Sequence, residues 1–157
     1  MDRLRDEGMM VDYVSFVAHA LPTREAICWA ASCHGGDTPG TAAETGALAA
    51  EAVARTRAWV RDPQEGLRNQ LLEMAERIGT DTASGWLCYA VAWNGSGSIV
   101  PPDNPPVMPE PFLHAKALLG AVALLSDGED ENAAPFLAHI DALARDVADG
   151  GWPGIEV

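Results

Sequence analysis

The chain has 157 residues, the size of one domain and enough to bury a hydrophobic core. It carries 23 acidic side chains against 10 lysines and arginines, a formal net charge of −13. This surplus repels phosphates at long range, so the composition argues against nucleic acid and anionic membranes as partners. We expect a cytoplasmic protein that binds another protein, as a monomer or a weak homodimer.

Apolar side chains recur at three- and four-residue steps along most of the chain, the pattern of amphipathic helices. Stretches rich in glycine, proline or capping residues separate these segments. Thr41 with Glu44 matches a capping box, while Pro22 and Pro135 stand where a helix is expected to begin. The sequence predicts seven helices, over residues 9–21, 22–34, 41–61, 62–79, 82–94, 112–125 and 135–150.

No convincing strand interrupts this pattern, since only Ile99-Val100 alternates and it is too short. We therefore expect an all-α fold, a compact single-domain bundle of about seven helices within residues 9–150. The charged residues 1–8 should form a flexible N-terminus, and residues 151–157 a C-terminal tail. In the last helix, Asp141 is expected to face solvent.

The helix predicted over residues 82–94 is apolar on nearly every side, which is typical of a helix buried at the centre of a bundle. Its Trp86, Tyr89 and Trp93 recur at helical spacing and share one face. The helix predicted over residues 112–125 is equally apolar. We expect these two helices to pack against each other.

Residues 95–111 connect these two helices and hold six of the chain's 11 prolines. Each proline fixes its own φ and keeps the preceding residue out of the helical region, so the segment must be extended coil. Two Pro-x-x-Pro motifs, beginning at Pro102 and Pro106, match the loosest form of a polyproline II ligand. The alternative is that the prolines only stiffen a connection that packs over Trp86 and Trp93.

A second candidate surface combines Trp59 with a cluster of four arginines. Arginine and tryptophan are residues that interfaces use as energetic hot spots. The same arginines also suit helix ends, where they would pair with Asp62 and Glu65. The sequence leaves both roles open. The cluster comprises Arg55, Arg57, Arg61 and Arg68.

The sequence shows no catalytic, metal or cofactor signature. Cys28, Cys33 and His34 lack the spacing of a zinc site, and no second cluster completes four ligands. Residues 95–98 form neither a phosphate loop nor a dinucleotide loop. With Cys88 there are three cysteines, all among apolar residues, which predicts buried thiols. We therefore predict a non-enzymatic protein without cofactor or metal.

A set of short motifs covers most of the chain, from about residue 20 to about residue 150. It comprises Arg24-Glu25-Ala26-Ile27-Cys28-Trp29-Ala30, Trp59-Val60-x-x-Pro63, Asp81-Thr82-Ala83-x-Gly85-Trp86, Trp93-x-Gly95, the proline pairs at 101–102 and 105–106, and His114-Ala115-Lys116-Ala117. In these motifs the chain resembles a family of small uncharacterised bacterial proteins that are often encoded near type VI secretion components. The resemblance implies a compact cytoplasmic domain with an accessory role, and it brings no activity or catalytic residue with it.

The sequence supports two hypotheses about function, which belong to different classes of protein. The first is a non-enzymatic interaction module, an accessory or adaptor protein of a bacterial secretion system. The alternative is an acidic inhibitor or immunity-type protein for a basic partner, because residues 127–157 hold eight acidic side chains and one arginine. The candidate contact residues are Arg57, Trp59, Arg61, Trp86, Trp93, Pro101, Pro102, Pro105 and Pro106.

Overall fold

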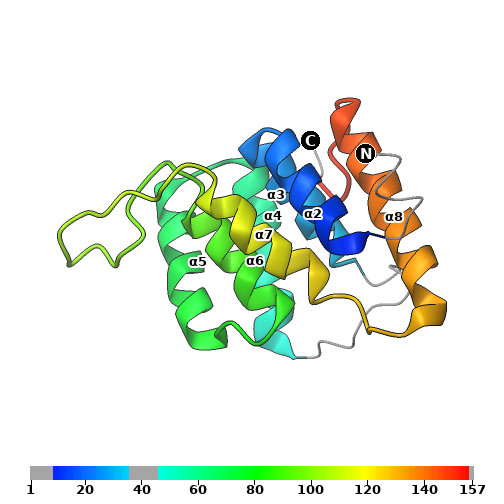
Figure 1. Cartoon of the computed structure of the whole chain (residues 1–157). Coiled ribbons are helices and arrows are strands. Elements are labelled where there is room, and N and C mark those ends of the chain that lie inside the picture. Colours follow the sequence, from blue (N-terminus) through cyan, green and yellow to red (C-terminus); the bar gives the residue numbers. More distant parts are fainter. Residues whose placement is uncertain (1–8, 36–45, 156–157) are drawn as a thin grey trace.

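The computed structural model describes residues 9–35 and 46–155 (Figure 1). All the helices in these ranges are α-helices, and the ranges contain no strand, which confirms the predicted all-α fold. The predicted flexible N-terminus and the predicted capping box of Thr41 and Glu44 lie outside the described residues. The helices are α2 (Met10–Ala20), α3 (Thr23–Cys33), α4 (Ala47–Arg61), α5 (Glu65–Ile78), α6 (Ala83–Ala92), α7 (Leu113–Ala123) and α8 (Asp130–Ala148).

Helix α6 lies at the centre of the bundle, because it packs against α3, α4, α5 and α7. Its Leu87, Cys88 and Val91 are completely buried. The most extensive contact is with α7, as the apolar sequences of the two helices predict. The Trp86 ring lies directly over Gly120 of α7, where a Cβ atom would stand 2.6 Å from the indole. A glycine at this position therefore allows the close approach of the two helices.

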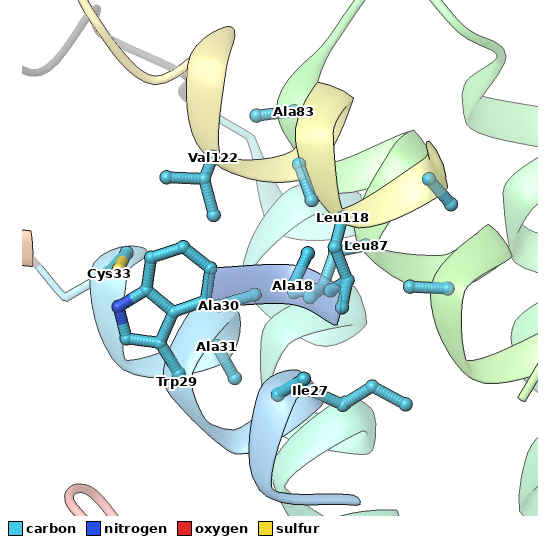
Figure 2. Close-up of a cluster of buried hydrophobic side chains, with 14 of the residues drawn as sticks. Ala18, Ile27, Trp29, Ala30, Ala31, Cys33, Ala83, Leu87, Leu118 and Val122 are labelled. Atoms are coloured by element: carbon cyan, nitrogen blue, oxygen red, sulfur yellow. The ribbon is translucent and has the colours of Figure 1, made fainter. Parts of the chain in front are cut away.

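The hydrophobic core receives side chains from each of α2 to α8, and Figure 2 shows Trp29 of α3 in it together with Leu87, Leu118 and Val122. The Trp29 side chain is completely buried. Its indole Nε1 donates a hydrogen bond of 2.9 Å to the carbonyl oxygen of Ile140 in α8. The indole thus contributes its large apolar area without leaving a buried donor unsatisfied.

A buried polar contact ties α8 to α2. The hydroxyl of Tyr13 donates to the Asp141 carboxylate over 2.7 Å, and Arg145 Nε donates to the same carboxylate over 2.9 Å. The prediction that Asp141 faces solvent is wrong, since it is 3% exposed. Burial, with the hydrogen bond and charge of Asp141, raises the pKa of Tyr13. The phenol therefore remains a donor at neutral pH.

Helix α8 begins at Asp130, five residues before the proline at which we predicted its start. The Asp127 side chain accepts hydrogen bonds from the Glu129 amide and from Asn132 Nδ2, which starts the helix earlier. Pro135 stands inside the helix on its exposed side. Its ring and missing N–H affect only a solvent-facing turn there.

The tail after α8 lies against the bundle. Trp152 and Ile155 are partly buried and pack on the core. The Arg24 guanidinium of α3 lies over the Trp152 ring, 5.1 Å from its centroid. Across residues 9–35 and 46–155, every helix is too short or too polar to traverse a lipid bilayer.

Candidate functional site

The connection between α6 and α7 leaves the body of the molecule as a long narrow loop (Figure 1). We call residues 98–108 the proline loop. Residues 101–108 are exposed throughout. The loop projects away from the helices (Figure 1), and because residues 101–108 are exposed, the alternative in which the prolines pack over Trp86 and Trp93 does not hold for these residues. The extended coil expected from the prolines is observed.

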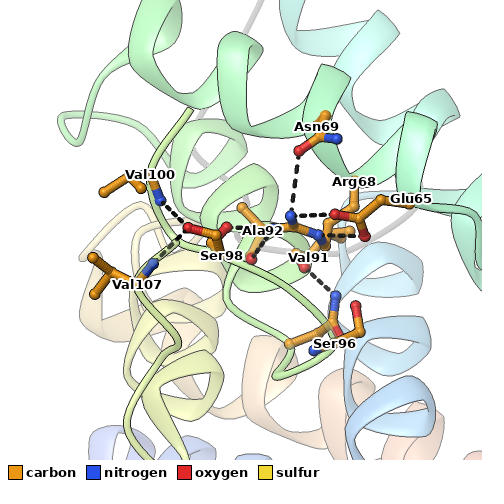
Figure 3. A network of polar contacts seen from close by, with 10 residues as sticks. Glu65, Arg68, Asn69, Val91, Ala92, Ser96, Ser98, Val100 and Val107 are labelled. Carbon is orange, nitrogen blue, oxygen red and sulfur yellow. Dashed lines mark hydrogen bonds and ion pairs between the residues drawn. The ribbon is translucent and has the colours of Figure 1, made fainter. Parts of the chain in front are cut away.

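Hydrogen bonds join the two limbs of the proline loop at its base. The Ile99 amide donates to the carbonyl oxygen of Val107 over 2.7 Å. The Ser98 hydroxyl oxygen accepts from the amides of Val100, at 3.2 Å, and Val107, at 2.9 Å (Figure 3). One serine therefore holds both limbs, and the residues beyond it form a closed loop.

Prolines dominate the tip of the loop, where Pro101, Pro102, Pro105 and Pro106 are all exposed. The Asn104 amide donates to the carbonyl oxygen of Pro101 over 3.0 Å and closes a turn. Because proline has no N–H, the limbs cannot form a continuous ladder. The tip is ordered by fixed φ angles and one turn instead of by paired strands.

Arg68 of α5 attaches the proline loop to the bundle (Figure 3). The side chain is 2% exposed, and its Nη1 donates to the carbonyl oxygens of Ala92, at 2.9 Å, and Ser98, at 2.7 Å. Its Nε donates to the Glu65 carboxylate over 2.8 Å. A Cβ atom on Gly97 would lie 2.6 Å from the guanidinium, so a larger residue there would require the Arg68 side chain to move. Since Ala92 ends α6, one arginine caps the helix and anchors the loop.

Of the pairings expected between the four arginines and Asp62 or Glu65, the described residues show the one between Arg68 and Glu65. The hydrogen bond from Arg68 lowers the pKa of Glu65, so this carboxylate stays charged well below neutral pH. The Asp62 carboxylate instead accepts a hydrogen bond from Gln64 Nε2 at 2.6 Å.

The four arginines of the predicted cluster face different surroundings. Arg55 pairs with Glu51 and bonds to Gln70. Arg61 is exposed at the end of α4, and Arg68 is buried under the loop base. Arg57 lines a separate pocket beside α3 and α8.

The aromatic face of α6 forms a half-buried row. The ring centroids of Tyr89 and Trp93 lie 4.7 Å apart, and those of Trp86 and Tyr89 lie 6.0 Å apart. The Trp86 indole donates to the carbonyl oxygen of Thr80 over 2.9 Å. Trp93 directly follows Ala92, the residue that Arg68 caps, so the aromatic row ends at the base of the proline loop.

Trp59 is 5% exposed and lies in the wall of a pocket of about 380 Å³ where α3, α4 and α5 meet the chain after α6. Arg24 occupies part of this region and donates to the carbonyl oxygens of Val60, at 2.6 Å, and Arg61, at 3.0 Å. Only a small part of the Trp59 indole is therefore available to a partner. The pocket's other walls include Pro63, Glu65, Asn94 and Ser96.

Cys28, Cys33 and Cys88 are buried thiols, as predicted. Burial raises the pKa of Cys28 to about 11 and also raises the pKa of Cys33. The His34 ring nitrogen Nε2 lies 2.9 Å from the carbonyl oxygen of Ala121, a contact between α3 and α7. The part of the chain that the structure describes holds no group of three or more His, Cys, Asp or Glu side chains arranged for a metal ion.

These features define a small all-α protein that presents a preformed, proline-rich loop. The family model described as "Family of unknown function (DUF6931)" matches residues 1–148, and the chain belongs to this family. Neither a curated protein nor a solved structure matches the chain.

Proposed function

We propose that the protein is a non-enzymatic interaction module that binds a protein partner through the proline loop. The observation that carries the proposal is the exposed run 101–108, held at its base by Ser98 and Arg68. A segment that is ordered before binding loses less conformational entropy when the complex forms. More of the free energy gained from its side-chain contacts then contributes to affinity, because less is needed to order the segment.

The chemistry of the loop favours a partner with an apolar or aromatic groove. Extended proline segments dock on aromatic surfaces because their shape is fixed in advance. Val107 and Met108, which are 48% and 57% exposed, add apolar area beside the prolines. The half-buried row of Trp86, Tyr89 and Trp93 ends at the loop base and extends the contact surface onto the bundle.

Within this proposal the partner is a component of a bacterial secretion system, and the protein is its accessory or adaptor. The support for this part is the resemblance of the sequence motifs to a family encoded near type VI secretion components. The identities of the proteins captured in the experiment below test whether the partner is a secretion-system component.

The experiment compares the wild-type protein with a loop variant in which Pro101, Pro102, Pro105 and Pro106 are replaced by serine. Each is immobilised, and captured proteins from cells of the source species are quantified by mass spectrometry. Pro135→Ala, at an exposed proline of α8, is the matched control. We expect the partner to be lost only from the loop variant, whose melting temperature should agree with that of the wild type within about 3 °C. Equal capture by all three proteins would overturn the proposal.

A second candidate, the acidic inhibitor of a basic partner, is favoured by the exposed acidic residues at the start of α8. Glu129, Asp130 and Glu131 are exposed, whereas Asp141 is buried in its contact with Tyr13 and contributes no surface charge. Binding to this acidic surface would weaken steeply between about 50 and about 300 mM salt. Binding through the proline loop would change little, so salt dependence separates the two functions.

A further inference from the structure

Arg57 of α4 differs from the other buried or half-buried arginines in its hydrogen bonding. It makes one hydrogen bond with the described residues, from Nη2 to the carbonyl oxygen of Ala31, and this bond is 3.4 Å long. Its Nε is buried and has no hydrogen-bond partner. By contrast, Arg55, Arg68 and Arg145 each donate to an oxygen at 3.0 Å or less.

An unsatisfied guanidinium in a partly buried position has a cost. A guanidinium has five N–H donors and no acceptor, and it stays charged at every physiological pH. Leaving a buried donor without a partner destabilises the folded protein. The terminal nitrogens of the same guanidinium share one long hydrogen bond with the described residues, so an ion or ligand that completes their hydrogen bonds is a specific explanation for a charged group at this position.

The Arg57 side chain lines a pocket of about 200 Å³ between the end of α3, α4, α8 and the C-terminal tail. His139 of α8 and Ser32 of α3 line the same pocket. The tail approaches closely at Gly154, where a Cβ atom would lie 3.4 Å from Arg57 Nε. Nε is thereby shielded, and the pocket is reached through the terminal nitrogens of the guanidinium.

We propose that the Arg57 pocket binds a small oxyanion, a carboxylate or a phosphate group, between Arg57 and His139. A planar guanidinium presents paired N–H donors that match two oxygens of either anion. The His139 ring supplies a further N–H donor. The Ser32 hydroxyl already donates to the carbonyl oxygen of Trp29 over 2.6 Å, so it adds no donor.

Among the described residues, no acidic side chain lines the pocket. Asp146 of α8 also lies in this region, but its carboxylate packs against Gly151 and forms no ion pair with Arg57 there. The net charge of −13 keeps anions away from most of the surface. A small anion is therefore retained where a concave, partly dehydrated site strengthens the attraction of a cation. This site is separate from the proline loop, and its test does not depend on the proposed function.

The experiment follows the Arg57 Nε–H signal and the backbone amides in two-dimensional NMR spectra at neutral pH. Inorganic phosphate and acetate are titrated separately, with chloride holding the ionic strength constant. We expect saturable shifts at the Nε–H of Arg57 and the amides of Ser32 and Gly35, with dissociation constants of about 0.1–10 mM. Saturation by phosphate alone identifies a phosphate site, and saturation by acetate alone identifies a carboxylate site. Saturation by both anions shows a site for either group.

Variants decide whether Arg57 holds the anion. Arg57→Gln should abolish the saturable shifts, while Arg61→Gln, one turn later on the same helix and exposed, should leave them unchanged. If Arg57→Gln does not fold, His139→Gln decides, with affinity expected to fall by at least about threefold. The absence of saturable shifts with both anions, or affinity unchanged in the deciding variant, would overturn the proposal.

Discussion

The carbonyl oxygen of Ser98 lies 2.7 Å from Nη1 of Arg68, so an arginine of α5 holds the first limb of the loop that follows α6. The same nitrogen donates to the last residue of α6, Ala92. The end of the central helix and the base of the proline loop therefore share one support. Loss of that support should affect the stability of the bundle and the order of the loop together.

Replacing Arg68 by methionine tests this coupling. The carbonyl oxygens of Ala92 and Ser98 would both lose a buried donor, which should lower the free energy of unfolding by about 2–4 kcal/mol. Urea denaturation measures the loss. Arg55→Met is the control, because its ion pair with Glu51 is partly exposed and should contribute no more than about 0.5 kcal/mol. Equal losses in the two variants would contradict the role of Arg68.

The contact between Tyr13 and Asp141 gives a second prediction. Tyr13→Phe leaves the buried carboxylate without its phenol donor, so unfolding should require about 1–3 kcal/mol less free energy. Tyr89→Phe, at a half-buried position in the aromatic row, keeps the ring stacking and should change stability by less than about 0.5 kcal/mol. Thermal and urea unfolding of both variants measure the difference. A Tyr13→Phe variant as stable as the wild type would show that α8 does not need this bond.

The thiols should be unreactive in the native protein. Burial raises the pKa of Cys28 to about 11, and Cys33 and Cys88 are also completely buried. A thiol-specific disulfide reagent should therefore react with none of the three thiols within minutes in buffer and with all three in denaturant. Rapid reaction of one equivalent without denaturant would disagree with the described packing.

His114 should make the protein less stable in mild acid. Burial, with the charge of nearby His19, lowers the pKa of His114 below its unfolded value of about 6.5. Between these two pKa values the unfolded chain binds more protons than the folded chain. The free energy of unfolding is therefore highest above a pH of about 6.5 and decreases as the pH falls through the pKa of folded His114. Free energies of unfolding at about pH 7.5 and about pH 5.5 measure the change.

His114→Gln should reduce the acid destabilisation relative to the wild type. Glu65 does not disturb this comparison, because its lowered pKa affects stability only at more acidic pH. A His114→Gln variant with the wild-type pH dependence would assign the effect to another group.

Local sequence patterns predicted the helices well because each helix buries a periodic apolar face. One error occurred where a long-range contact decides the outcome, and another where a local side-chain contact does. Asp141 looks like a surface residue until Tyr13, far away in sequence, is placed against it. Pro135 looks like a helix start, yet the side-chain contacts of Asp127 begin the helix earlier.

The candidate site was predictable in part. Its prolines determine an extended connection, but they do not determine whether that connection lies on the bundle or projects from it. The direction depends on Arg68, whose acceptors on Ala92 and Ser98 are backbone carbonyls that no side-chain pattern reveals. The sequence places Trp59 among candidate contact residues, yet its side chain is only 5% exposed, and Arg24 caps the end of the same helix beside it.

The most direct test of the preformed loop is amide hydrogen exchange at Ile99 and Val107, followed by NMR in the wild type and in Ser98→Ala. In the wild type these amides donate to Val107 and to the Ser98 hydroxyl, so exchange should be slowed by at least about tenfold relative to an open chain. In Ser98→Ala the protection of Val107 should disappear while the helices keep theirs. Exchange of both amides at open-chain rates in the wild type would contradict the account.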